Sequence, residues 1–186
     1  MKELATDLVD YLAQLDAADD RACQLTTSLT EAQAGWRPGA GAGWSIAQCL
    51  EHTAITNGVY LQNIREAAVR ARPGHVALQT GGWFSQFFLK KSEPPPSLKI
   101  KAPRKIQPRP TLPLCEALAE FLASNADVRS FVNETADRNL CATRFRNPFM
   151  PGLNFTIASG LLIIAAHNRR HLWQAERVRM AGDFPA

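Results

Sequence analysis

The chain has 186 residues, of which 46% are hydrophobic and 20% are charged, and its formal net charge is +4. This length and apolar content predict one globular domain, residues 1–186, with a core large enough to fold alone. The longest apolar run, from Gly160 to Ala166, is too short to span a bilayer, and the first ten residues lack the pattern of a signal peptide. These features exclude a membrane-spanning protein, and we expect a cytoplasmic one.

The positive charge is concentrated in one segment of the chain. Residues 90–109 carry seven basic residues and one acidic residue, a net charge of +6, which leaves the remainder at −2. With the aromatic residues that precede it, this segment could bind an acidic partner or single-stranded nucleic acid. No recognition module accompanies it, so we favour aromatic side chains that pack on the domain and charges that remain solvated. Nucleic acid is not an expected partner.

Four segments show the apolar spacing of amphipathic helices, with Ser45 and Thr156 as good N-caps for the second and the last. The expected helices cover about residues 4–30, 45–72, 114–135 and 156–180. Proline and glycine residues between about 73 and 111 predict a long irregular connection, with an extended piece at 98–101, and residues 137–155 are expected to form another loop. The pattern predicts an all-α fold, a four-helix bundle, in which the long connection allows helices two and three to run parallel.

Three of the four histidines could share one metal ion. His167 and His171 are four residues apart, so their side chains project from one face of the last helix, and His52 falls near the second turn of the second helix. Three neutral imidazoles hold a divalent metal and leave a coordination position for water or substrate. The alternative is a solvated pair on a helix surface and a hydrogen-bonded histidine elsewhere. An apolar stretch directly before His167 favours the metal, because it predicts a buried position where an unpartnered ring is costly.

Other residues near the histidines have several possible roles. Gln174 lies near the face of His171 and could hold its second ring nitrogen, which would place it in the second coordination shell. Glu51 is adjacent to His52 and points about 100° round the helix, so it is a candidate second-shell group, a base or a surface residue. Cys49 lies three residues before His52 and is the internal rival to an external nucleophile. His75 is expected in a surface loop. The four cysteines are expected to be reduced, because they are scattered and form no CxxC pair.

Three parts of the chain resemble the signature segments of the DinB-like superfamily, also described as DinB/YfiT-like metalloenzymes. The similar segments are Trp36-Arg37-Pro38, then Trp44-Ser45-Ile46-Ala47 leading to Leu50-Glu51-His52, and Ala166-His167-Asn168-Arg169-Arg170-His171-Leu172-Trp173-Gln174. The resemblance implies a bundle with up-down-down-up topology, often in a homodimer, and a three-histidine site for zinc, nickel, iron or a similar ion. By this resemblance His52, His167 and His171 are the metal ligands.

The resemblance also implies a class of reaction. Members of the superfamily include transferases that join small thiols to electrophiles, a thiol-dependent isomerase and hydrolases. We expect a metal-dependent thiol transferase or a hydrolase that acts on a small molecule, and the alternative is a non-catalytic metal-binding or stress-associated ligand-binding module. Asn168 occupies the position where the HExxH motif places its base, which argues against peptide hydrolysis. No internal pair of nucleophile and base is visible, so a low-molecular-weight thiol is the expected nucleophile and co-substrate.

Overall fold

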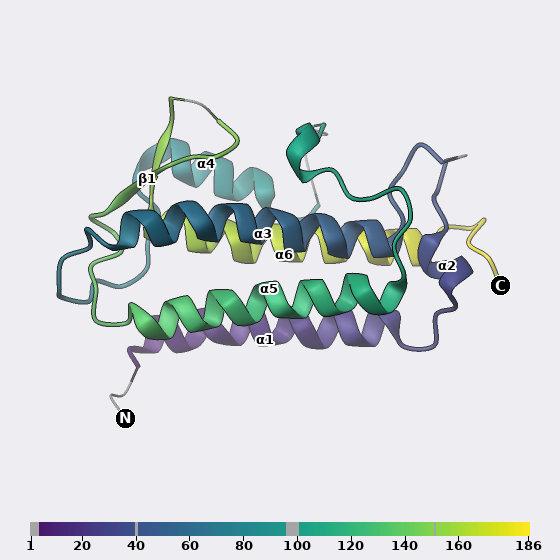
Figure 1. The fold of residues 1–186 in the computed structure, drawn as a ribbon, viewed down its shortest axis with the longest axis horizontal. Coiled ribbons are helices and arrows are strands. Elements are labelled where there is room, and N and C mark those ends of the chain that lie inside the picture. The colour runs from purple at the N-terminus through teal and green to yellow at the C-terminus, as the bar shows by residue number, and fades with distance from the viewer. Residues whose placement is uncertain (1–3, 40, 96–100, 151) are drawn as a thin grey trace.

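Four long helices form the body of the protein (Figure 1). The computed structural model describes residues 4–39, 41–95, 101–150 and 152–186. The long helices are α1 (Thr6–Thr26), α3 (Ile46–Ala68), α5 (Leu114–Glu134) and α6 (Ile157–Arg179). In Figure 1, α1 and α6 run in one direction and α3 and α5 in the other, and α3 packs beside both α5 and α6. The predicted four-helix bundle and its up-down-down-up topology are confirmed.

The N-caps that the sequence predicted are present. The hydroxyl of Ser45 accepts from the backbone N–H of Gln48, whose side chain accepts from the backbone N–H of Ser45 in return. The hydroxyl of Thr156 accepts from the N–H of Ser159 at the start of α6. These bonds satisfy backbone donors that a helix start leaves unpaired. The starts of α3 and α6, which carry the histidines, are therefore fixed by local sequence.

The first helix is shorter than expected. It ends at Thr26, and a separate short helix, α2 (Glu31–Gly35), follows it. The Thr26 hydroxyl donates to the carbonyl oxygen of Ala22, and Ser28 adopts a φ of 67°. A left-handed conformation is costly for a side chain other than glycine and interrupts an α-helix. The leucine spacing that suggested a helix to residue 30 therefore continues through a turn.

The connection expected between residues 73 and 111 is not irregular throughout. It contains α4 (Gly82–Ser92), which packs against α6, and a single 3-10 turn, η1 (Arg104–Ile106). Phe84 and Phe88 of α4 pack on the core, with ring centroids 6.2 and 5.7 Å from that of Phe155. Trp83 of the same helix is 76% exposed. The prediction of packed aromatic residues is thus correct for one face of α4 only. The extended piece expected at 98–101 lies outside the described residues except for Lys101.

The loop expected at residues 137–155 contains a short antiparallel hairpin. Its strands are β1 (Arg144–Arg146) and β2 (Asn154–Thr156), with Phe145 opposite Phe155 in the register. Both phenylalanines are buried, and the ring of Tyr60 on α3 lies 5.9 Å from that of Phe145. The flanking arginines of β1 are exposed. Alternation of one buried residue between two exposed ones is typical of a strand with one packed face.

The core consists of apolar clusters at different levels along the bundle. The cluster toward the N-terminal end of α6 includes Leu15, Ile64, Val128 and Leu161. A second cluster, nearer the C-terminal end of α6, contains residues of the same four helices: Ala22, Leu50, Phe121 and Leu172. The histidines lie between these levels, where α3 and α6 pack together.

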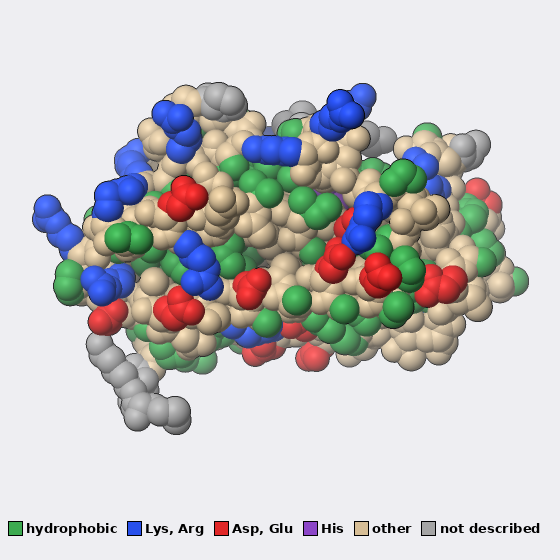
Figure 2. All heavy atoms as spheres, in the orientation of Figure 1, with side chains coloured by type: hydrophobic (Ala, Val, Ile, Leu, Met, Phe, Trp, Pro, Cys, Tyr) green, Lys and Arg blue, Asp and Glu red, His purple; other side chains and the backbone are tan. Residues whose placement is uncertain are grey.

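The surface charges are unevenly distributed. Figure 2 shows Lys and Arg side chains prominent along the upper edge, over the hairpin, α4 and the connection that contains η1. Asp and Glu side chains gather lower in the same view, toward α5 and α1. Within the described ranges, every helix falls short of the length and apolar character that a bilayer-spanning segment needs.

Candidate metal centre

His52, His167 and His171 converge at one point between α3 and α6. One ring nitrogen from each lies within 4.8 Å of the others. His52 is 3% exposed and His171 is 7% exposed, whereas His167 is half-buried. The structure therefore brings together the three residues that the sequence singled out, from two helices that run in opposite directions.

The spacing of the pair on α6 suits two ligands of one ion. The Nε2 atoms of His167 and His171 lie 3.1 Å apart. Metal–nitrogen distances of about 2.0–2.1 Å place two neighbouring ligand atoms about 2.8–3.4 Å apart, with octahedral geometry at the short end and tetrahedral geometry at the long end. The observed separation falls within this range, so the two Nε2 atoms can bind a single cation without a change of the helix.

The orientation of His52 is set by a backbone carbonyl group. Its Nδ1 atom donates to the carbonyl oxygen of Ile106 at 2.6 Å. A carbonyl oxygen only accepts, so the proton of the neutral ring is on Nδ1 and the lone pair is on Nε2. Metal-bound histidines commonly donate their other ring N–H to a carbonyl or carboxylate in this way. His52 is thus held in the tautomer that a metal ligand needs.

All three histidines are kept neutral by their surroundings. Burial is the largest cause of the lowered pKa of His52, and it holds the pKa values of His167 and His171 well below their usual range. The positive charge of Arg170 lowers each of these pKa values further. Neutral imidazoles are the form that binds metal. The site is therefore ready to accept a cation at neutral pH without first losing protons.

The second ring nitrogens on α6 are less well satisfied. The Nδ1 atoms of His167 and His171 are buried and have no hydrogen-bond partner of normal geometry. Gln174 lies beside His171, where its side chain acts to raise the pKa of that ring. The structure thus places Gln174 near the ligand that the sequence suggested. Arg170, between the two histidines in sequence, donates from Nη1 to the carbonyl oxygen of Lys91 at the end of α4, at 2.9 Å.

Glu51 is buried beside the centre but is occupied elsewhere. It is 1% exposed, and its carboxylate accepts from the backbone N–H of Arg109 at 2.8 Å and forms an ion pair with the guanidinium of the same residue. It does not belong to the cluster of possible ligand atoms found among the described residues. Glu51 instead fastens the segment that carries Ile106, and through that segment it supports His52. The sequence did not predict that Ile106 or Arg109 would lie near the histidines.

Trp44 forms one wall of the centre. Its ring centroid lies 4.5 Å from that of His52 and 5.8 Å from that of His171. The indole directly precedes the N-cap of α3, so the capping interaction that fixes the helix start also fixes the wall. Tryptophan supplies a large apolar surface beside the polar rings, which keeps water from part of the site.

Two other sequence candidates lie away from the cluster. Cys49 is fully buried among Leu25, Ile46 and Ala175, and burial raises the pKa of its thiol far above the usual range. His75 is exposed, with Nε2 2.9 Å from a carboxylate oxygen of Asp7, as a surface-loop histidine was expected to be.

A hollow of about 410 Å³ opens beside the N-terminus of α3. Its walls include Ser45, Gln48 and the segment 110–113, and none of the three histidines lines it. The hollow is therefore separate from the histidine cluster.

The fold and these histidines define a class of helical bundles with a candidate metal centre. The sequence profile of the DinB superfamily matches residues 14–175, a range that contains all three histidines. The chain therefore belongs to the DinB superfamily, as the signature segments predicted.

Among solved structures, the fold is similar to that of YfiT from Bacillus subtilis, which is described as "a probable metal-dependent hydrolase with an unusual four-helix bundle topology". The TM-score is 0.60 over 97% of this chain and 91% of that one, at 13% sequence identity. This likeness establishes the shared fold. A comparison with curated proteins finds no match.

Proposed function

We propose that this protein binds one divalent transition metal through His52, His167 and His171 and uses it to act on a small molecule. Two features of one cluster carry the proposal together: a ring nitrogen of each histidine converges on one point, and a hydrogen bond fixes the tautomer of His52. Zinc, nickel and iron all accept imidazole nitrogen, so each is a candidate. Three protein ligands leave at least one position open, as catalytic centres require.

When bound, such a metal lowers the pKa of a coordinated water or thiol and supplies a nucleophile at neutral pH. The protein contributes the rest of the site. The carbonyl oxygen of Ile106 holds His52 in place, and the indole of Trp44 shields one side of the rings. The guanidinium of Arg170 adds positive charge close to all three imidazoles. Positive charge around the centre favours anionic nucleophiles and anionic substrate groups.

Hydrolysis is the first candidate reaction. The likeness in fold to YfiT, described as a probable metal-dependent hydrolase, supports it. A separate carboxylate base is not needed, because water bound to a metal ionises near neutral pH. The engagement of Glu51 with Arg109 is consistent with this chemistry.

Transfer of a small thiol to an electrophile is the second candidate. Imidazole-bound metals of borderline character also bind thiolate well, and thiolate is the stronger nucleophile. Cys49 is packed in an apolar cluster and does not join the histidines, so the thiol would come from solution. A non-catalytic metal-binding or stress-associated ligand-binding module is the competing proposal, and it predicts metal binding without turnover. Under either proposal we expect a homodimer in the cytoplasm.

Metal analysis of untagged protein, followed by an activity screen, tests the proposal. The purified chain is dialysed against zinc, nickel or ferrous salts and its metal content is measured. We expect close to one ion per chain, and protein that stays metal-free would contradict the proposal. The loaded protein is then screened against ester, amide and epoxide substrates with and without added thiol. Metal-dependent turnover supports an enzyme, whereas its absence with every substrate favours the binding module.

A further inference from the structure

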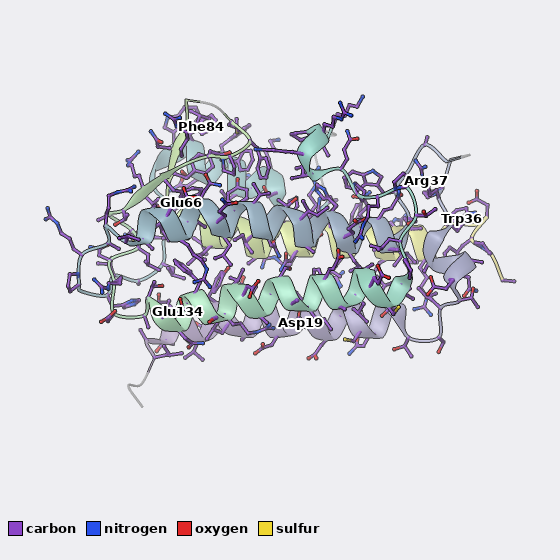
Figure 3. All side chains as sticks on the ribbon, in the orientation of Figure 1. Asp19, Trp36, Arg37, Glu66, Phe84 and Glu134 are labelled. Atoms are coloured by element: carbon purple, nitrogen blue, oxygen red, sulfur yellow. The ribbon has the colours of Figure 1, made fainter. Side chains whose placement is uncertain are left out.

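A layer of buried polar side chains crosses the bundle next to the candidate metal centre. It consists of Asn57 on α3, Asn125 on α5 and Asn168 on α6, each with 0% exposure, together with the partly buried Asp19 on α1. Figure 3 shows Asp19 where α1 and α5 lie together. We call these four residues the amide layer. Every long helix of the bundle contributes one member.

The amide layer lies between two apolar levels of the core. On α5 it falls between Phe121, in one cluster, and Val128, in the other. On α6 it likewise falls between Ala165 and Leu172. Buried amides are costly unless they are paired. A polar layer at one level of an otherwise apolar core therefore favours the one alignment of the helices that brings the amides together.

The hydrogen bonds of the layer connect all four helices. The Nδ2 atom of Asn57 donates to Oδ1 of Asn168 at 3.1 Å and to Oδ1 of Asn125 at 3.2 Å. The Nδ2 atom of Asn168 donates to the same oxygen of Asn125 at 2.7 Å. Asn125 in turn donates from Nδ2 to Oδ1 of Asp19 at 2.6 Å. Asp19 also forms an ion pair with Arg129.

The carboxylate of Asp19 sets the direction of these bonds. An ionised carboxylate only accepts, so Asn125 must turn its NH₂ group toward α1. Its carbonyl oxygen then faces α3 and α6, where it accepts from both Asn57 and Asn168. The orientation of each amide follows from the next one, and this arrangement pairs the NH₂ group of all three amides. The Oδ1 atom of Asn57 is buried and has no hydrogen-bond partner among the described residues.

The layer directly joins the two helices that carry the histidines. Asn168 follows His167 in sequence, and its bond to Asn57 runs from α6 to α3, the helix of His52. A shift of α6 by one turn would move His167 and His171 away from His52. The same shift would carry Asn168 toward an apolar level and leave its partners unpaired, which costs more than an ordinary hydrogen bond gains.

We propose that the amide layer is a register device that holds His52 opposite His167 and His171. Asn57, Asn125 and Asn168 are positioning residues, since they act on the centre through the alignment of α3 and α6. A single buried polar residue fixes the register of helices in coiled coils by the same physics. The inference rests on the proposed metal site, but the hydrogen bonds of the layer join protein atoms only, so the alignment can be measured in the metal-free protein.

The test replaces all three amides by leucine, which has a similar size and no polar atoms. In the variant Asn57→Leu/Asn125→Leu/Asn168→Leu, Asp19 keeps its ion pair with Arg129, so no charge is left without a partner. We expect the metal-free variant to melt at the same temperature as the wild type or higher, because joint apolar replacement of hydrogen-bonded partners is often neutral or stabilising and here also removes the unpaired Oδ1 atom of Asn57. We expect its zinc dissociation constant to rise at least about tenfold. The absorption spectrum of the cobalt-loaded variant should differ from that of the wild type.

A metal-free measurement reports the register independently. The ring centroids of His52 and His171 lie 4.6 Å apart, so the wild type should show a nuclear Overhauser contact between their ring protons. The triple variant should show a weaker contact or none. Asn63→Leu is the matched control, because Asn63 lies on α3 and, among the described residues, its side chain bonds to the carbonyl oxygen of Val59 in its own helix and to no other helix. This control should match the wild type in zinc affinity and in the Overhauser contact.

The proposal is wrong if the triple variant folds and matches the wild type in zinc affinity, cobalt spectrum and Overhauser contact. If the triple variant does not fold, Asn125→Ala decides by the same measurements: reduced affinity and a weaker contact support the register device, and unchanged values refute it. If the wild type itself binds no metal, the proposed function fails on its own account. The Overhauser contact then decides the register question alone, since its loss in the variant supports the inference and its retention overturns it.

Discussion

The Nδ1 atom of His52 lies 2.6 Å from the carbonyl oxygen of Ile106, 54 residues further along the chain. This bond ties a candidate metal ligand to the connection between α4 and α5. The connection is fastened a second time three residues later, where Arg109 pairs with the buried Glu51 on the turn of α3 that carries His52. A segment that the sequence predicted to be an irregular connection with solvated charges is therefore part of the centre's support.

Removal of any one imidazole should abolish stable metal binding. In His52→Ala, His167→Ala or His171→Ala, two protein nitrogens remain, too few for a stable protein site of this type. We expect metal content after dialysis to fall from about one ion per chain to a small fraction of that in each variant. His75→Ala is the control, because His75 contacts Asp7 at the surface and should retain wild-type metal content. Elemental analysis decides, and full retention in any triad variant would remove that residue from the ligand set.

Loss of the Arg109 side chain should weaken metal binding without removing a ligand. The variant Arg109→Ala leaves Glu51 buried with only the backbone N–H of residue 109 as a partner, so the segment that holds His52 loses one of its attachments. We expect a weaker metal affinity, but a loss smaller than the roughly tenfold or greater one that follows removal of a group hydrogen-bonded directly to a metal ligand. Arg104→Ala is the control from the same segment, since Arg104 is exposed on η1. Equal zinc affinities for the two variants would show that the Glu51 attachment does not support His52.

Local patterns in the sequence were sufficient to predict the bundle and the three histidines. The spacing of His167 and His171 and the caps at Ser45 and Thr156 each depend on residues within one or two helical turns. The bond from His52 to Ile106 has no such local signal, because it joins residues that only the folded connection brings together.

The sequence did not predict the helix α4 or the burial of the amide layer. The glycines and prolines that flank α4 marked the whole stretch as irregular, although eleven residues between them fold as a helix under the packing of Phe84 and Phe88 on the core. Asn57 and Asn168 are ordinary polar residues in a helical pattern, where an exposed position is the usual expectation. Their burial depends on partners from other helices, so periodicity alone could not reveal it.

Two glycines in the histidine-bearing helices should respond to alanine in opposite ways. A Cβ at Gly160 on α6 would lie 2.8 Å from Cδ1 of Ile64 and 2.8 Å from Cε1 of Phe145, so Gly160→Ala overpacks the core and should lower the free energy of unfolding by about 1–3 kcal/mol. A Cβ at Gly58 on α3 meets nothing within 4 Å, so Gly58→Ala should raise that free energy by about 0.5–1 kcal/mol through helix propensity. Urea unfolding of both variants checks the pair. Equal changes would contradict the close packing at Gly160.

The stability of the metal-free protein should fall as the pH is lowered from about 7.5 to 5.5. Burial lowers the folded-state pKa values of His52, His167 and His171. The unfolded chain titrates near its ordinary histidine pKa of about 6.5, so below that pH it takes up protons that the folded state does not, and unfolding becomes more favourable. Above about pH 7.5 the three histidines are neutral in both the folded and the unfolded state, so their contribution to the free energy of unfolding no longer changes with pH. Urea unfolding at both pH values measures the slope, which should be shallower in His171→Leu. A wild-type free energy of unfolding that is the same at both pH values would contradict the burial of neutral histidine rings.

The last prediction concerns the nucleophile, which we expect to come from solution in either proposed reaction. Cys49 is buried among apolar side chains, and burial disfavours its thiolate, so it cannot act as an internal nucleophile at neutral pH. Cys49→Ser should therefore leave turnover of the loaded protein close to that of the wild type, since the thiol neither binds metal nor reacts. Turnover is measured in both proteins with and without a glutathione-like thiol. A requirement for added thiol supports transfer, and thiol-independent turnover that survives in Cys49→Ser supports hydrolysis by water. Thiol-independent turnover that disappears in Cys49→Ser, while the variant keeps its fold and metal content, would contradict an external nucleophile.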